Sequence, residues 1–287
     1  MRVGFAQIAG FVLAAVLAIA PATQGNAQTR TLSSTSFKGG DGSFDRVVKE
    51  GIVLGIASDL PFTYYDEKTK KNDGMDVKIM EEVTNRLGIK NVKWELVQFD
   101  ALIPGLVSKR WDVVVDNIHE NEKRLAVISF TGPAYWYGSS LAVQKGNPLK
   151  IHSWDDMAGK TVGTVRGSFN QQLLENRKDL KELKLYTQNE AEMADLLAGR
   201  VDVLMEDDIK VGTFIKEHAG VGIEMASGYA ARPEEYGYAR YGVRKEDVDL
   251  NHAISRTIAE MRGDGVIGKI ITDYGLTQRN LWYFPVN

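Results

Sequence analysis

The stretch FDALIPGLVSKRWDVVVDNIHENEKR, residues 99–124, contains a helix signal, a strand signal and a polar segment in that order. Residues 102–107 carry apolar side chains at the helical period, which predicts a short helix with one apolar face. The run 113–115 is continuous and β-branched, as is typical of a parallel strand covered on both faces. The sequence turns polar at Asp116, where we expect the strand to end. Ligands bind beyond the carboxyl ends of strands in open α/β sheets, so this segment is a candidate binding site.

Strand and helix signals alternate on both sides of this stretch. Residues 52–57 have the composition of a buried strand, and residues 93–97 give a second strand signal. Residues 75–87 have the apolar period of a helix that stops at a glycine. The alternation predicts an α/β fold with a parallel sheet and crossover helices. AGRVDVLMED (198–207) repeats the form of SKRWDVVVDN (108–117), which favours two lobes of similar build.

Composition and the N-terminus indicate an exported protein. A formal net charge of −3 argues against a nucleic-acid partner, and the absence of cysteine excludes disulfides and thiolate metal sites. Arg2, the apolar run 8–20 and the small residues near Ala27 predict a signal peptide over 1–27, followed by a mobile leader to residue 43. A retained membrane anchor is the alternative, but the apolar run is short for a bilayer.

FDALIPGL followed by Arg124, GMDVKIMEEVTNRLGI and LNHAISRTIAEMRGDGVIGKIITDYGL together resemble the polar amino-acid family of ABC-transporter substrate-binding proteins, solute-binding family 3. Its best-known members bind lysine, arginine and ornithine, or histidine, or glutamine. The resemblance implies a two-lobe fold of the type II periplasmic-binding-protein kind. Each lobe is then a mostly parallel sheet flanked by helices, and two hinge crossings join them. The implied divisions are 44–137 with 239–287 for lobe one, 138–229 for lobe two and 230–238 for the second crossing.

The same resemblance implies a function. A monomeric periplasmic protein would capture an amino acid or a zwitterionic derivative by closing its cleft, and would deliver it to an inner-membrane ABC permease. No cofactor, metal or catalytic residue is expected. The alternative is a cyclohexadienyl dehydratase on this fold, which needs a general acid such as His119 or Glu206. Presentation of a ligand to a membrane sensor also stays open.

Two charged residues carry the implied contacts with the ligand's main-chain groups. Arg124 offers a planar donor fork suited to a carboxylate, and the family's arginine at this position clamps the ligand's α-carboxylate. Asp207 matches the family's acid that holds the α-ammonium. Its neighbours Glu206 and Asp208 remain alternatives, because acids also favour the first turn of a helix.

Further residues follow from the family's loops. Ser168 and Phe169, at the start of an expected helix, are implied to help bind the carboxylate. Phe62 and Phe99 are implied to pack on the ligand's side chain, with core packing as the alternative for each. Asp59 belongs to the first ligand loop, where the match is imperfect, and whether its side chain points into the cleft stays open.

The polar residues after the central strand differ from the small ones usual in the family. Asn117 offers a donor and an acceptor. His119 brings bulk and a titration expected near pH 6.5, unless it is an exposed loop histidine. Asp116 is expected either to pair with Arg124 or to meet a cationic ligand.

Overall fold

The computed structural model describes residues 40–282, except for the side chain of Tyr236. The predicted signal peptide and the predicted leader up to residue 39 lie outside these residues. Ser43, the last residue of the predicted leader, is the first residue of helix α1. Within residues 40–282, none of the helices has the length and apolar character needed to cross a membrane.

The strands are β1 (Ile52–Ile56), β2 (Tyr64–Asp66), β3 (Lys71–Asp73), β4 (Val92–Leu96), β5 (Val113–Ile118), β6 (Ser129–Phe130), β7 (Tyr135–Gln144), β8 (Thr161–Val165), β9 (Glu182–Tyr186), β10 (Val203–Asp207), β11 (Ile223–Met225) and β12 (Tyr236–Val243). The α-helices are α1 (Ser43–Glu50), α2 (Met75–Arg86), α3 (Leu102–Val107), α4 (Glu122–Leu125), α5 (Phe169–Leu174), α6 (Asn189–Leu197), α7 (Asp208–Glu217), α8 (Val248–Gly263) and α9 (Val266–Asp273).

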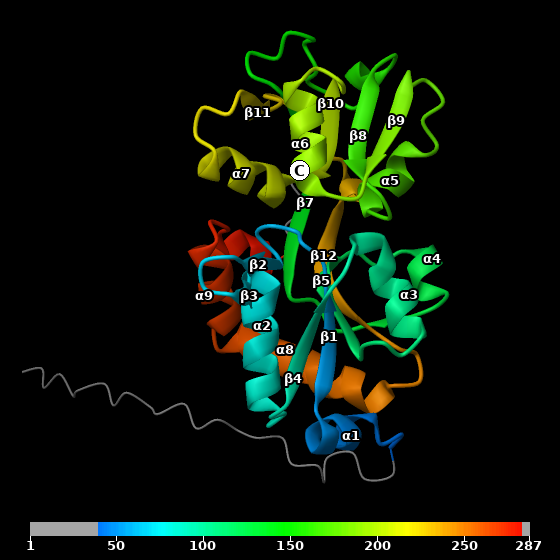
Figure 1. Cartoon of the computed structure of the whole chain (residues 1–287), viewed down its shortest axis with the longest axis vertical. Coiled ribbons are helices and arrows are strands. Elements are labelled where there is room, and N and C mark those ends of the chain that lie inside the picture. Colours follow the sequence, from blue (N-terminus) through cyan, green and yellow to red (C-terminus); the bar gives the residue numbers. More distant parts are fainter. Residues whose placement is uncertain (1–39, 283–287) are drawn as a thin grey trace, which may run out of the picture. The chain divides into compact units, whose positions relative to one another are not determined.

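Hydrogen-bonded strands follow one path in the order β4-β1-β5-β12-β7-β10-β8-β9 (Figure 1). β1 pairs in parallel with β4 and β5, and β8 pairs in parallel with β9 and β10. We call the β4-β1-β5 part the first lobe and the β10-β8-β9 part the second lobe. The antiparallel strands β7 and β12 join the two parts. The predicted mostly parallel α/β fold is confirmed. The exact lobe limits, two of which would fall inside β7 and β12, stay a prediction.

The central strand of the first lobe is buried on both faces, as its composition predicts. Val113 and Val115 face the core built on α1, α2, α8 and α9, whereas Val114 faces the cluster of α3 and Trp111. All three valines have no exposed surface. Burying a side chain of this size contributes roughly 1.5–3 kcal/mol, so the strand anchors the lobe.

The second lobe repeats this arrangement around β10. Val203 and Met205 pack on the side of α5, and Leu204 packs on the side of α6 and α7. The repeated motif in the sequence therefore corresponds to two strands that occupy equivalent places in two covered sheets.

Three local features differ from the sequence-based expectations. β5 continues to Ile118, so Asp116 and Asn117 lie in the strand rather than after it, because Ile118 still pairs with Arg240 of β12. Arg124 lies in the short helix α4 and not in a loop, since the Asn121 side chain caps that helix by accepting the Arg124 backbone N–H over 2.9 Å. The β2–β3 hairpin was not expected.

Candidate functional site

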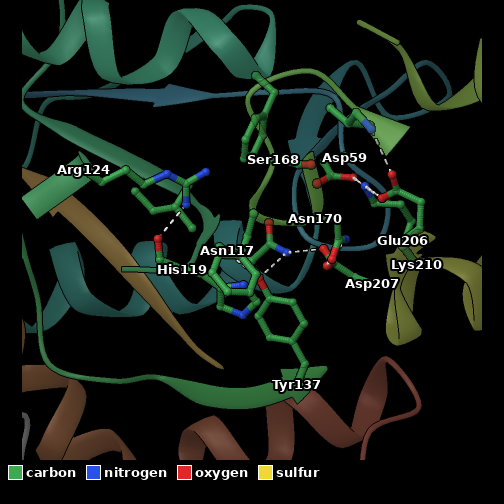
Figure 2. A pocket seen from close by; sticks show the side chains of 14 residues that line it. Asp59, Asn117, His119, Arg124, Tyr137, Ser168, Asn170, Glu206, Asp207 and Lys210 are labelled. Carbon is green, nitrogen blue, oxygen red and sulfur yellow. Dashed lines mark hydrogen bonds and ion pairs between the residues drawn. The ribbon is translucent and has the colours of Figure 1, made fainter. Parts of the chain in front are cut away.

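A cavity of about 20 Å³ lies where β5 of the first lobe meets β10, α5 and α7 of the second. Eight of the ten residues nominated from the sequence line it: Asp59, Phe99, Asn117, His119, Arg124, Ser168, Phe169 and Asp207. Figure 2 shows Arg124 on one side, a cluster of Asp59, Glu206 and Lys210 on the other, and Asn117 between them. The structure therefore brings together residues that are far apart in the sequence.

Arg124 is buried, with 6% of its surface exposed. Its Nη1 donates to the His119 carbonyl oxygen over 2.6 Å, and its Nη2 donates to the Gly167 carbonyl oxygen over 2.9 Å. Burial lowers the pKa of Arg124 to about 10, which leaves it charged at neutral pH. Both hydrogen-bond partners are neutral, and the guanidinium forms no ion pair with a carboxylate of residues 40–282. Arg124 therefore forms no ion pair with Asp116, which was one of the two roles expected for that acid.

Asp207 ends β10 and faces the cavity. Asn117 Nδ2 donates to its Oδ2 over 3.1 Å, and Asn170 Nδ2 approaches its Oδ1 at 3.5 Å. Burial raises the pKa of Asp207 to about 8, even though the charge of Lys210 acts in the opposite direction. A ligand ammonium placed here would favour the ionised form of this carboxyl.

A three-residue charge cluster forms the wall beside Asp207. Lys210 Nζ lies 2.8 Å from Glu206 Oε2 and 3.1 Å from Asp59 Oδ1. Asp59 follows β1 and Lys210 lies on α7, so this contact joins the two lobes. The orientation of Asp59 was left open by the sequence. The side chain lines the cavity, where it forms an ion pair with Lys210.

Aromatic rings form another side of the cavity. His119 stacks on Tyr137 with 4.4 Å between ring centroids, and Phe169 meets it edge-on at 4.9 Å. Burial, together with the charge of Arg124, lowers the pKa of His119 to about 3. The expected titration near pH 6.5 and the exposed alternative are both wrong. Phe99 lies against the guanidinium of Arg124, at 5.9 Å from the ring centroid.

Two nominated residues do not line the cavity. Asp116 is fully buried, and neighbouring positions of a strand point to opposite faces, so it turns away from the side of Asn117. Neither of its carboxylate oxygens has a hydrogen-bond partner among the described residues. Burial, with the charges of nearby acids, raises its pKa well above the usual value. Phe62 is fully buried and packs in the first-lobe core against Tyr135 and Tyr137.

The sequence reasoning missed some lining residues and considered one only as an alternative. The remaining lining residues are Ile118, Tyr137, Val165, Asn170, Glu206 and Lys210. Lys210 follows Glu206 by four positions, across the junction of β10 and α7, and this short separation of opposite charges was a usable signal. Tyr137 had no such local signal: its hydroxyl donates to the Asn117 carbonyl oxygen, which only the pairing of the folded chain brings near.

The family model of bacterial extracellular solute-binding proteins, family 3, matches residues 52–277. The chain belongs to this family. The lysine/arginine/ornithine-binding periplasmic protein of Escherichia coli (strain K12) is 28% identical over 228 residues, which cover 77% of this chain and 87% of that protein.

Solved structures agree in fold. A mutant of ArgBP from T. maritima superposes with a TM-score of 0.74 at 24% identity, covering 81% of this chain and 98% of that one. An ancestral arginine-binding protein bound to arginine gives a TM-score of 0.71 at 26% identity, covering 78% and 98%. These neighbours share the type II periplasmic-binding-protein fold.

The family favours ligand binding over the dehydratase alternative. Its description and the similar proteins are those of binding proteins, not of enzymes. The two general acids considered are also poorly suited: His119 has a pKa of about 3, and Glu206 is paired with Lys210. Within residues 40–282, no group of three His, Asp or Glu side chains is arranged to hold a metal ion.

Proposed function

We propose that this solute-binding protein binds an amino acid, or a zwitterionic derivative of one, in the cavity between Arg124 and Asp207. The observation that carries the proposal is the buried guanidinium of Arg124, which lines the cavity and, among the described residues, has only neutral carbonyl partners. A buried charge without a counter-ion is costly, so an incoming carboxylate gains a strong, geometrically matched contact.

The opposite charge is supplied by Asp207. Its carboxyl lines the same cavity as Arg124 and comes from the second lobe, whereas Arg124 follows β5 of the first. A molecule with a carboxylate and an ammonium on one carbon would engage both groups. Ligands that lack one charge would leave a buried polar group unpaired, which supports discrimination between zwitterions and simple ions.

Binding requires the walls of the cavity to move apart. A cavity of about 20 Å³ holds little more than one water molecule. The contacts from Arg124 to the Gly167 carbonyl and from Asn117 to Asp207 join the two lobes, and they would have to open. Strands β7 and β12, which continue the sheet from one lobe to the other, are the proposed hinge.

The family and the predicted signal peptide support a proposal for the protein's cellular location and partner. The curated relative is named as a periplasmic protein, and proteins of this kind act as substrate-binding components of ABC transporters. We propose that the mature protein is a periplasmic monomer and that an inner-membrane ABC permease is its partner.

A thermal-shift screen tests the binding role. Each of the common amino acids is added to the purified protein, and preferential binding to the folded state should raise its melting temperature; at 100 times Kd the stabilisation is about 2.7 kcal/mol. Arg124→Ala should abolish the rise. Arg166→Ala is the matched control, because Arg166 is exposed and does not line the cavity.

Two results would contradict the proposal. If no amino acid or amino-acid derivative raises the melting temperature, the binding role fails. If acetate, a carboxylate without an amine, stabilises the protein as well as any zwitterion does, the role of Asp207 is wrong. Comparing Asp207→Asn with Asp208→Asn identifies the acid, since only Asp207 lines the cavity.

A further inference from the structure

Lys210 is a buried ammonium inside the proposed ligand site. Its side chain is 6% exposed, and it lies between Asp59, which follows β1 of the first lobe, and Glu206, which lies in β10 of the second lobe. Burial disfavours the charged form, but the negative charges of Asp59 and Glu206 outweigh this effect and raise the pKa of Lys210 well above its usual value. The lysine is therefore a permanent positive charge in the cavity wall.

The two carboxylates that face Lys210 also have other donors. Glu206 Oε1 accepts the Thr164 hydroxyl and the Val165 backbone N–H, each over 3.0 Å. Asp59 Oδ1 accepts Asn189 Nδ2 over 2.8 Å. With these donors and Lys210 in place, neither acid needs a cation from the ligand.

A third acid, Glu192, lies near this cluster but does not add a negative charge to it. Glu192 is fully buried, and burial together with the charge of Glu206 raises its pKa well above the usual value. Its uncharged form is thereby favoured. Once a ligand ammonium occupies Asp207, the described residues that line the cavity offer no unpaired acid to a second positive charge.

A larger cavity of about 530 Å³ adjoins the first and shares Asp59, Phe99 and Val165 with it. Its polar wall is mainly uncharged and includes the side-chain amides of Gln98, Gln188 and Asn189. Besides Asp59, the one charged lining residue in the described part of the chain is Glu190, which is exposed. A side chain leaving the first cavity would thus pass the Asp59–Lys210 pair and enter an amide-rich space that Glu190 also lines.

We propose that Lys210 is a built-in counter-ion that restricts the site to amino acids with uncharged side chains, which extend into this second cavity. The inference rests on the proposed function, because it assumes that Arg124 and Asp207 hold the zwitterionic end. A cationic side chain would have to displace Lys210 and leave its ammonium buried and unpaired, which is strongly unfavourable. An anionic side chain would compete with two carboxylates that already hold the lysine.

Calorimetric titration of the wild-type protein with L-arginine, L-lysine, L-glutamate and the uncharged amino acids tests the proposal. We expect an uncharged amino acid to bind at least about tenfold more tightly than any charged one. Lys210→Gln should raise the affinity for L-arginine by about tenfold or more, since Asp59 and Glu206 then lack their cation. Lys216→Gln, on the exposed side of the same helix, should behave as wild type.

The outcomes separate this inference from the proposed function. Arginine, lysine or glutamate as the tightest wild-type ligand overturns the inference alone, and so does a folded Lys210→Gln protein without gained arginine affinity. The wild-type comparison decides the matter even if that variant does not fold. If no amino acid binds the wild-type protein, the proposed function fails and the inference with it.

Discussion

Asn117 Nδ2 lies 3.1 Å from Asp207 Oδ2 and 3.1 Å from the Tyr137 hydroxyl oxygen. The amide thus connects β5 of the first lobe with β10 of the second at the centre of the cavity (Figure 2). Its own Oδ1 is buried and has no partner among the described residues. One short side chain therefore orients the acid that we assign to the ligand's ammonium.

Asn117→Asp should weaken ligand binding more than Asn117→Ala. The aspartate adds a second carboxyl beside Asp207, which raises the pKa of the pair further and disfavours the ionised form that an ammonium needs. We expect a loss of affinity of about tenfold or more at neutral pH for the aspartate variant, measured by calorimetry. Equal losses in both variants would show that the amide contact, and not the charge, is what matters.

Ligand binding should release a proton. With a pKa of about 8, Asp207 is mostly protonated near neutral pH, and contact with an ammonium requires it to ionise. Affinity should therefore rise with pH up to about 8, by as much as tenfold per unit, and then level off. Titrations in phosphate and in Tris buffer, whose ionisation heats differ, count the released protons.

The control for this prediction is Asp207→Asn, which has no carboxyl to titrate. This variant should bind more weakly and release no proton. Proton release that persists in it would assign the titration to another group, such as Asp208, whose pKa burial raises to about 6.

Asp76 should make the fold less stable as the pH rises. Its Oδ1 accepts the hydroxyls of Tyr135 and Tyr241 over 3.0 and 2.9 Å, and burial raises its pKa to about 7. Between about pH 4 and 7 the folded state then binds a proton that the unfolded state has lost, so its stabilising effect disappears across this range. The total is on the order of 4 kcal/mol at most, at about 1.4 kcal/mol per pKa unit.

Melting temperatures of wild type and Asp76→Asn across this range check the effect. The wild-type value should fall more steeply with pH than that of the variant, because the amide does not titrate. Asp45→Asn, an exposed acid on α1, should keep the wild-type slope. Parallel curves for wild type and Asp76→Asn would contradict the assignment.

Gly237→Ala should disturb the aromatic side of the cavity. A Cβ at this position would lie 2.2 Å from His119 Cδ2, so the ring must leave its place against Tyr137 and Phe169. Overpacking of this kind costs about 1–3 kcal/mol, and we expect a comparable loss of binding free energy, measured by calorimetry. Gly263→Ala, where a Cβ meets nothing within 4 Å, is the control. Unchanged affinity in Gly237→Ala would show that the His119 ring does not shape the site.

The parts of the site that the sequence predicted share one property. Arg124, Asp207 and Asn117 lie at or just beyond the end of a strand that is recognisable from its own apolar run, so their place in the sheet follows from local pattern. The predicted ligand contact of Phe62 could not be decided in this way. An aromatic residue in a loop can turn to the core or to the cavity, and only its packing against Tyr135 and Tyr137 decides which.

The sequence by itself determined the α/β alternation, the two similar covered strands and the family, because helix and strand periods and buried runs are properties of neighbouring residues. Only the tertiary structure decided what each polar group meets. Pairing with β12 extends β5 and turns Asp116 away from the cavity, and contact between the lobes gives Asp59 the ammonium of Lys210. Both outcomes depend on residues distant in the chain, since burial and ion pairing are set by three-dimensional proximity and leave no trace in a local pattern.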